Sequence, residues 1–213
     1  MKNIFINSTI FIISTIIMLL IVEGVLRIKN SDMKNYNIEM WHYAKELKVI
    51  SNNPKLGHEH KISSHAVLQS VKIRTNNYGL RGEDITIEKE VPRRILILGS
   101  SATLGWGVDE NQTMAHVLGE KLGKEVEVLN AGIGNYNTLR YVELFLSKLK
   151  VLKPTDIIIH YFLNDTEDLK PADSNWFLQH SQLAVVIWNK FYMIKNRENS
   201  LEDYYQEIYT KRV

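Results

Sequence analysis

The chain has 213 residues, of which 45% are hydrophobic and 23% are charged, and its formal net charge is +2. This length allows one globular domain with an appendage, and so small a net charge leads us to expect no nucleic-acid partner. The sequence contains no cysteine, which excludes disulfide bonds and thiolate metal ligands.

The first feature along the chain is an uninterrupted apolar run. Residues 3–22 carry no charge and are mostly Ile, Leu, Phe, Val or Met. At about 1.5 Å per residue, a helix of this length crosses the roughly 30 Å hydrocarbon core of a bilayer. We therefore predict a transmembrane anchor over residues 1–27 that meets the lipid bilayer through residues 3–22. A cleaved signal peptide is the main alternative, although the run is long for one and lacks a small-x-small cleavage site. A buried helix of a soluble domain is a third.

The charges beside this run bear on its orientation. Lys2 alone precedes it, whereas Arg27, Lys29 and Lys34 follow it. Counting basic residues weakly favours a cytoplasmic globular part.

Residues 28–70 are predicted to be a polar juxtamembrane connector, with a helix over residues 33–50. Within the connector, a strand at His58-Glu59-His60 would put both imidazoles on one face. A metal site would need a third ligand, so we expect a solvated polar surface and no metal.

The next segment contains one strand and an arginine with two interpretations. Val71 to Thr75 alternates apolar and polar residues, which predicts a half-buried strand before a turn at residues 76–79. Arg81 follows this turn. It either caps the rim of an active site or forms a surface ion pair with Glu83 or Asp84, and we favour the ion pair.

From residue 94 the pattern becomes regular. Apolar runs predict buried strands at residues 94–99, 126–131 and 156–163, and helices are expected over 111–123, 137–150, 176–196 and 201–210. Asn111 or Thr113 is the expected N-cap of the first helix, and Gly123 its end. Strands that alternate with helices over short connections predict an α/β fold with a parallel sheet.

Three turns of unusual composition follow the three strands. They are Gly99-Ser100-Ser101, the glycine-rich segment 130–137, and Asn164-Asp165. In a parallel sheet these turns share the carboxyl edge. A serine that opens a helix gains backbone N–H donors, and Asn164 offers a side-chain amide. These groups suit a nucleophile with an oxyanion hole.

At these residues the chain resembles the SGNH (GDSL-type) hydrolase family. The family's first block, Gly-Asp-Ser with Thr-x-Gly-x-Gly-Val, resembles Gly99-Ser100-Ser101-Ala-Thr-Leu-Gly-Trp-Gly-Val108. Its second block, Asn-x-Gly-x-x-Gly, resembles Asn130-Ala-Gly-Ile-Gly-Asn135. Its third, Gly-x-Asn-Asp, resembles Phe162-Leu-Asn-Asp165. The similarity covers roughly residues 70–195.

The resemblance implies a three-layer, flavodoxin-like SGNH hydrolase domain over residues 71–213. It makes Ser101 the nucleophile. The oxyanion hole is then formed by the N–H of Ser101, the N–H of Asn135 (with Gly134 making room) and the side chain of Asn164. The implied reaction is ester hydrolysis or acetyl transfer on an envelope carbohydrate or another ester, without cofactor or metal. Many members of this family are anchored by a single N-terminal membrane helix and act outside the cytoplasm. The resemblance therefore implies a single-pass membrane protein with an extracytoplasmic globular part.

Several residues depart from the family pattern. Ser100 replaces an aspartate, and Asn135 and Phe162 replace glycines. The family's Asp-x-x-His block, which supplies the base and its carboxylate, does not occur in the 213 residues, so we expect the C-terminal part of the fold to be missing. None of the other histidines is well placed as a base: His160 is expected in mid-strand, and His116 and His180 in helices.

Two functional interpretations remain. One is an active serine esterase or acetyl-transferring enzyme, and the other is an inactive, truncated, membrane-bound carbohydrate-binding relic. A nucleotide site is disfavoured because neither a Walker loop nor Gly-x-Gly-x-x-Gly is present. The remaining alternative is that the three turns are ordinary loops of the sheet and form no functional site.

Overall fold

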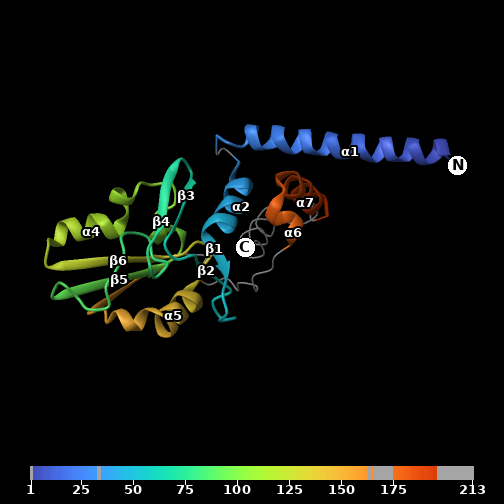
Figure 1. Cartoon of the computed structure of the whole chain (residues 1–213). Helices are drawn as coiled ribbons and strands as arrows, with labels where there is room; N and C mark the ends of the chain where they lie inside the picture. The colour runs from blue at the N-terminus through green and yellow to red at the C-terminus, as the bar shows by residue number, and fades with distance from the viewer. Residues whose placement is uncertain (1, 33–34, 163–164, 166–174, 196–213) are drawn as a thin grey trace.

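The computed structural model describes residues 2–32, 35–162, 165 and 175–195. Helix α1 (Lys2–Lys29) projects from the rest of the chain as a single rod (Figure 1). It is the one helix of the described ranges that is long and apolar enough to cross a membrane. Its apolar window is not buried against the rest of the chain, so the alternative of a buried helix in a soluble domain is wrong.

The globular part is built on a parallel three-stranded sheet. Strands β5 (Arg93–Gly99), β6 (Val126–Gly132) and β7 (Asp156–His160) lie in the order β6-β5-β7. Helix α4 (Met114–Leu122) connects β5 to β6, and α5 (Thr138–Ser147) precedes β7. The predicted α/β fold with a parallel sheet is therefore confirmed.

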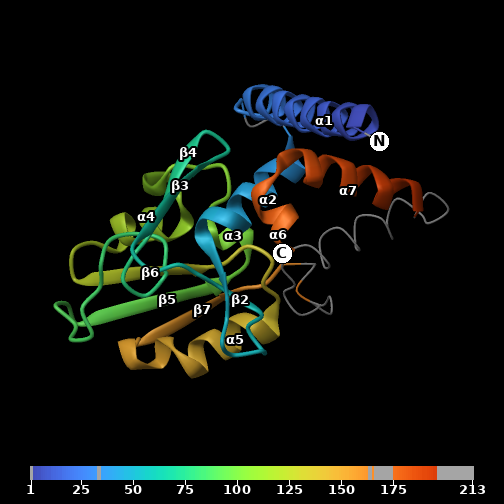
Figure 2. The same ribbon diagram turned by 45° about the vertical axis from the view of Figure 1, so that its right-hand side comes forward.

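The alternating side chains of β5 divide the core into two layers. Ile95 and Ile97 pack with Ala115 on the α4 side. Leu96 and Leu98 pack on the other side, in a cluster that includes Tyr141 and Leu144 of α5. The sheet thus lies between α4 and α5, as Figure 2 shows.

The ends of these helices differ in part from the prediction. Thr113 is the N-cap of α4, because its side chain accepts a hydrogen bond of 3.3 Å from the N–H of His116, and Gly123 ends the helix as expected. The preceding turn, Glu110–Gln112, is a 3₁₀ helix, so the predicted start at residue 111 is too early. Helix α5 ends at Ser147, and another 3₁₀ turn, Leu149–Leu152, replaces its predicted last turn.

Strand β7 corrects a prediction about burial. It is a strand, as expected, but it ends at His160 and is not buried: Ile158 is 37% exposed and Ile159 is 52% exposed. The reason is its place in the sheet. β7 pairs with β5 along one edge and is the last strand of the sheet in the described part of the chain.

The segment before the sheet packs at its carboxyl edge. Helix α2 (Tyr36–Leu47) ends three residues earlier than predicted, because β1 (Lys48–Ile50) pairs with β2 (His58–His60). Strands β3 (Ser64–Leu68) and β4 (Val71–Thr75) form an antiparallel hairpin, which confirms the strand predicted at residues 71–75. Tyr43 and Leu47 of α2 pack with Leu68 and Ile73 of this hairpin and with Leu104 of helix α3 (Ser101–Leu104).

The C-terminal helix predicted over residues 176–196 is two helices. They are α6 (Trp176–His180) and α7 (Gln182–Lys195), with Ser181 in an extended conformation between them. The helix predicted over residues 201–210 lies outside the described residues.

Candidate active site

The candidate site lies where the winding of the sheet reverses. The chain passes from β5 to β6 on one side and then crosses to β7 on the other side of β5. In open α/β sheets, ligands bind at the carboxyl ends of the strands at such a switch point. The last residue of β5, Gly99, is in register with Gly132 of β6 and with His160 of β7. Two of the three predicted turns, after β5 and β6, are therefore brought to one edge.

Two glycines let helix α3 lie directly on the strand ends. A Cβ atom on Gly132 would come within 2.0 Å of the backbone nitrogen of Leu104. A Cβ atom on Gly99 would come within 2.0 Å of Oγ1 of Thr103. Neither contact is sterically possible, so both positions require glycine. This close packing holds the start of α3, where Ser101 lies, against the sheet edge.

The two serines of the first turn have different environments. Ser100 is buried, and its carbonyl accepts a hydrogen bond of 3.0 Å from the N–H of Leu104. Ser101 is the exposed first residue of α3. Its hydroxyl makes no hydrogen bond to a described residue. The serine predicted to be the nucleophile is therefore open to solvent, and its backbone N–H occupies a helix position that lacks an intrahelical partner.

Arg81 holds the other end of α3. This role differs from the ion pair that we favoured for this residue. Its side chain is buried and donates hydrogen bonds of 2.7–2.8 Å to the carbonyls of Leu104, Gly105 and Val108. Its backbone N–H donates to the carbonyl of Asn130 in β6. The predicted surface ion pair is wrong, because the guanidinium binds the carbonyl of Leu104 at the end of α3 and the carbonyls of Gly105 and Val108 after it. Arg81 thus ties the loop after Ser101 to β6.

The second turn presents a residue, Gly134, that is held through both of its backbone polar groups. The N–H of Gly134 donates to the hydroxyl of Tyr43 at 2.8 Å, and the carbonyl of Gly134 accepts from Nε2 of His58 at 2.9 Å. Asn135 follows in the left-handed conformation, with φ of 65°, which asparagine adopts more readily than most residues. In a trans peptide, the N–H of Asn135 points away from the carbonyl of Gly134. The contact with His58 therefore fixes the direction of the Asn135 N–H.

A chain of hydrogen bonds continues behind this turn. The hydroxyl of Tyr43 donates to Nε2 of His60 at 2.7 Å, and Nδ1 of His60 lies 3.0 Å from the carbonyl of Gly79. Because a carbonyl only accepts, Nδ1 of His60 carries the proton and Nε2 is the acceptor. The same reasoning protonates His58 on Nε2. These contacts define which ring nitrogen of each imidazole donates to the backbone.

The environment of these histidines corrects a prediction. His58 and His60 do lie on one face of a strand, but both are buried instead of forming a solvated surface. Burial lowers the pKa of His60 to about 4, and it lowers the pKa of His58 well below its usual value. Nearby Lys48, also buried and 4.4 Å above the ring of Tyr43, has its pKa lowered by burial too. His58 and Tyr43 support the second turn through their hydrogen bonds to Gly134, and His60 supports it through Tyr43.

Only part of the third turn can be described. Asn164, the predicted side-chain donor of the oxyanion hole, lies outside the described residues. Its neighbour Asp165 is buried, and its Oδ2 accepts hydrogen bonds from the hydroxyl of Tyr141 at 3.0 Å and from the N–H of Phe162 at 2.9 Å. Asp165 therefore links the N–H of Phe162, just after β7, to Tyr141 of α5.

The histidines considered as bases occupy different places. His160 is the last residue of β7, not a mid-strand residue, and its Nδ1 lies 2.9 Å from Oγ1 of Thr103. His116 and His180 are exposed on α4 and α6. No described histidine makes a hydrogen bond with Ser101. Among the described residues, no group of three or more His, Cys, Asp or Glu side chains is arranged to hold a metal ion.

Sequence reasoning missed the residues that support the site. Tyr43 and Arg81 bond to backbone groups far along the chain, and such contacts leave no local pattern. For Asp165 a local signal does exist, because an aspartate that follows a strand often accepts hydrogen bonds from neighbouring backbone N–H groups. Comparison of the sequence with protein-family models and with curated proteins gave no match.

Proposed function

We propose that this chain is an SGNH-type serine protein that transfers acyl groups from esters, with Ser101 as the nucleophile. The observation that carries the proposal is the position of Ser101: it is exposed, it opens α3 directly after the central strand, and it lies at the switch point of the sheet. The hydrogen bonds that hold both backbone polar groups of Gly134 at the same edge support it.

The proposed chemistry begins with attack by Oγ of Ser101 on the ester carbonyl. Negative charge develops on the carbonyl oxygen, and the N–H groups of Ser101 and Asn135 and the amide of Asn164 stabilise it. The tetrahedral intermediate expels the alcohol, which takes up the proton released by the serine. Water or a sugar hydroxyl then attacks the acyl-serine, releasing the acyl group and restoring the hydroxyl of Ser101. No cofactor or metal takes part in these steps.

The proposed location is a membrane surface. In this proposal α1 is a single-pass anchor and the globular part is extracytoplasmic, where ester groups on envelope carbohydrates are accessible. The support is the exposed apolar surface of α1, which has no packing partner in the described domain over its first twenty residues and would be costly to leave in water.

An inactive, carbohydrate-binding role is the second candidate. The observation that favours it is the hydroxyl of Ser101, which makes no hydrogen bond to a histidine or carboxylate in the part of the chain that is described. A serine without a general base is a weak nucleophile at neutral pH.

Hydrolysis of p-nitrophenyl acetate by the full chain in detergent micelles separates the two candidates. The first predicts hydrolysis above the buffer rate, lost in Ser101→Ala and retained in the matched variant Ser100→Ala. Equal rates for the wild type and Ser101→Ala would contradict it. In that case, saturable binding of an acetylated oligosaccharide would support the second candidate.

A further inference from the structure

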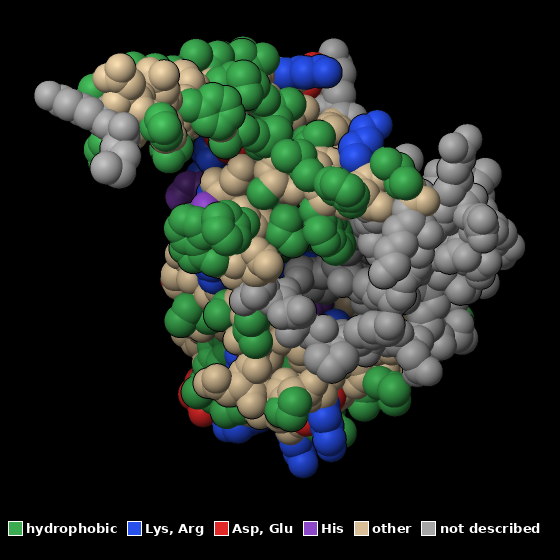
Figure 3. All heavy atoms as spheres, turned by 90° about the vertical axis from the view of Figure 1, so that its right-hand side faces the viewer, with side chains coloured by type: hydrophobic (Ala, Val, Ile, Leu, Met, Phe, Trp, Pro, Cys, Tyr) green, Lys and Arg blue, Asp and Glu red, His purple; other side chains and the backbone are tan. Residues whose placement is uncertain are grey.

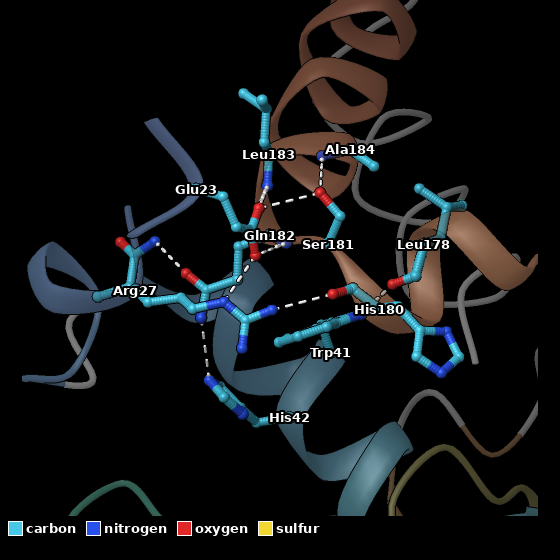
Figure 4. A network of polar contacts seen from close by, with 11 residues as sticks. Glu23, Arg27, Trp41, His42, Leu178, His180, Ser181, Gln182, Leu183 and Ala184 are labelled. Atoms are coloured by element: carbon cyan, nitrogen blue, oxygen red, sulfur yellow. Dashed lines mark hydrogen bonds and ion pairs between the residues drawn. The ribbon is translucent and has the colours of Figure 1, made fainter. Parts of the chain in front are cut away.

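The end of α1 is joined to the start of α7 by a carboxylate. Oε1 of Glu23 accepts a hydrogen bond of 3.0 Å from the N–H of Gln182, and Oε2 accepts one of 2.9 Å from the N–H of Leu183. Oε2 also accepts from the hydroxyl of Ser181 at 2.9 Å. Glu23 thus takes up N–H groups at the first turn of a helix that lies about 160 residues later (Figure 4).

Further polar contacts fix the same junction. Arg27 donates to the carbonyl of His180 at 2.9 Å, and the side chain of Asn30 donates to the buried side chain of Gln182 at 3.0 Å. The indole of Trp41 in α2 donates to the carbonyl of Leu178 in α6. Helices α6 and α7 are therefore held at the end of α1. The first residue of α1 that contacts α7 in this junction is Glu23, which directly follows the predicted membrane span.

Helix α7 has two unlike faces. Gln182 and Val185 are buried against the rest of the chain. An apolar stripe on another face is formed by Ile187, Phe191 and Ile194, which are spaced i, i+4 and i+7. The side chains of Phe191 and Ile194 are 69% and 70% exposed. The helix contains lysines but no acidic residue. This combination is typical of helices that lie in the interface of an anionic bilayer.

The start of α7 lies against the last part of α1. Figure 1 shows α1 along its length and α7 nearly end-on, so α7 crosses the end of α1 instead of running beside it. Both α6 and α7 lie at the end of the globular part nearest to the apolar portion of α1 (Figure 1). Seen from that end, hydrophobic side chains gather over α1 and over the described surface below it (Figure 3). The exposed Trp176 and Phe177 of α6 add aromatic groups suited to the headgroup region.

We propose that α6 and α7 form a membrane-surface element, in which Ile187, Phe191 and Ile194 enter the outer few ångströms of the same bilayer that α1 crosses. The proposal rests on the membrane anchor in the proposed function, but not on catalysis. The Glu23 cap then sets the depth of the element, because it fixes the start of α7 where α1 leaves the hydrocarbon core. The element would hold the catalytic domain against the membrane in one orientation.

Single-cysteine labelling tests this proposal, since the chain has no native cysteine. The full-length variants Phe191→Cys and Ile194→Cys carry an environment-sensitive fluorophore in vesicles of phosphatidylcholine and phosphatidylglycerol. Ile12→Cys in α1 reports the bilayer interior, and Leu146→Cys on the exposed face of α5 reports water. Quenching is compared between a spin-labelled lipid and aqueous cobalt.

We expect the probes at 191 and 194 to be quenched several-fold more by the lipid quencher than the probe at 146, and to be shielded from cobalt. If the probes at 191 and 194 show the same quenching as the probe at 146, while the probe at 12 is quenched by lipid, the anchor stands and the surface element is refuted. If 12 is also aqueous, both the anchor and this proposal fail. Disulfide cross-linking of two Phe191→Cys copies without lipid quenching would assign the face to a second chain instead. Because quenching does not depend on catalysis, a protein without ester hydrolysis would still give these same quenching results if the surface element exists.

Discussion

The backbone N–H of Gly134 donates a 2.8 Å hydrogen bond to the hydroxyl of Tyr43, a residue 91 positions earlier in the chain. Tyr43 lies in α2, in the segment between the apolar helix and the sheet. This contact, with the one from His58 to the carbonyl of the same glycine, makes that segment part of the candidate active site. The peptide that presents the N–H of Asn135 is thus held from outside the sheet.

Replacing Tyr43 by phenylalanine removes the acceptor for the Gly134 N–H and the donor to His60. A buried donor left without a partner costs about 1–3 kcal/mol of unfolding free energy. If Ser101 acts as proposed, its acylation rate also falls by up to about 100-fold, because the oxyanion donor shifts. Urea unfolding and ester hydrolysis measure the two effects. The control is Tyr78→Phe, whose hydroxyl makes no hydrogen bond to a described residue; equal behaviour of the two variants would contradict the role of Tyr43.

Gly134→Ala tests the same contact sterically. An added Cβ would come within 2.6 Å of Cε1 of Tyr43, whose ring is fully buried and has no room to move. Overpacking of this kind costs about 1–3 kcal/mol. Gly119→Ala in α4 is the matched control, since the nearest atom to its Cβ would be Cγ2 of Val128 in β6, 3.7 Å away. Within a helix, alanine is more stable than glycine by about 1 kcal/mol. A Gly134→Ala variant as stable as wild type would show that the turn is not tightly held.

The buried histidines predict a loss of stability in acid. Burial lowers the pKa of His60 from 6.5 to about 4, so the unfolded chain binds a proton more readily than the folded chain between these values. Stability is therefore full above about pH 6.5 and falls as the pH drops toward 4, by about 3 kcal/mol at most from His60, and His58 acts in the same direction. Urea unfolding at pH 7 and pH 4.5 measures this, and the loss should be smaller in His60→Gln. An equal loss in that variant would assign the effect to other groups.

Arg81→Lys should be far more harmful than an ordinary surface substitution. A lysine has no planar fork and loses contacts to the carbonyls of Leu104, Gly105 and Val108. We expect a loss of about 2–3 kcal/mol in unfolding free energy. Arg93→Lys, at an exposed pair with Asp156, should leave the unfolding free energy almost unchanged, because solvent screens an exposed ion pair. A similar small effect for both would show that Arg81 does not hold α3.

The sequence predicted the elements whose signals are local. Apolar runs and helix caps such as Thr113 and Gly123 correctly predicted that β5, α4, β6 and α5 exist, although the start of α4 and the end of α5 differ by three residues. The parallel sheet then brings Gly99 and Gly132 together. The burial of β7 was mispredicted because a run of isoleucines is equally apolar in a central strand and in an edge strand. Composition does not record which neighbours cover a strand.

The support of the site could not be predicted from the sequence, for a different reason. His58 and His60 lie in a polar segment, so their composition indicated a solvated surface. Their burial depends on contacts with Gly79 and Gly134, which lie 19 and 76 residues away. Likewise, Ser181, where the predicted C-terminal helix is interrupted, donates a hydrogen bond to Glu23, which lies 158 residues earlier. Such pairings are set by the tertiary fold.

Covalent trapping of Ser101 is the most direct test of the central claim. The full chain is incubated with a fluorophosphonate, which forms a stable adduct with an activated serine, and the labelled peptide is identified by mass spectrometry. The account predicts an adduct on Ser101 that is absent in Ser101→Ala, unchanged in Ser100→Ala and slower to form in Tyr43→Phe. Labelling of Ser100 instead, or no labelling of a chain that is folded by circular dichroism, would contradict it.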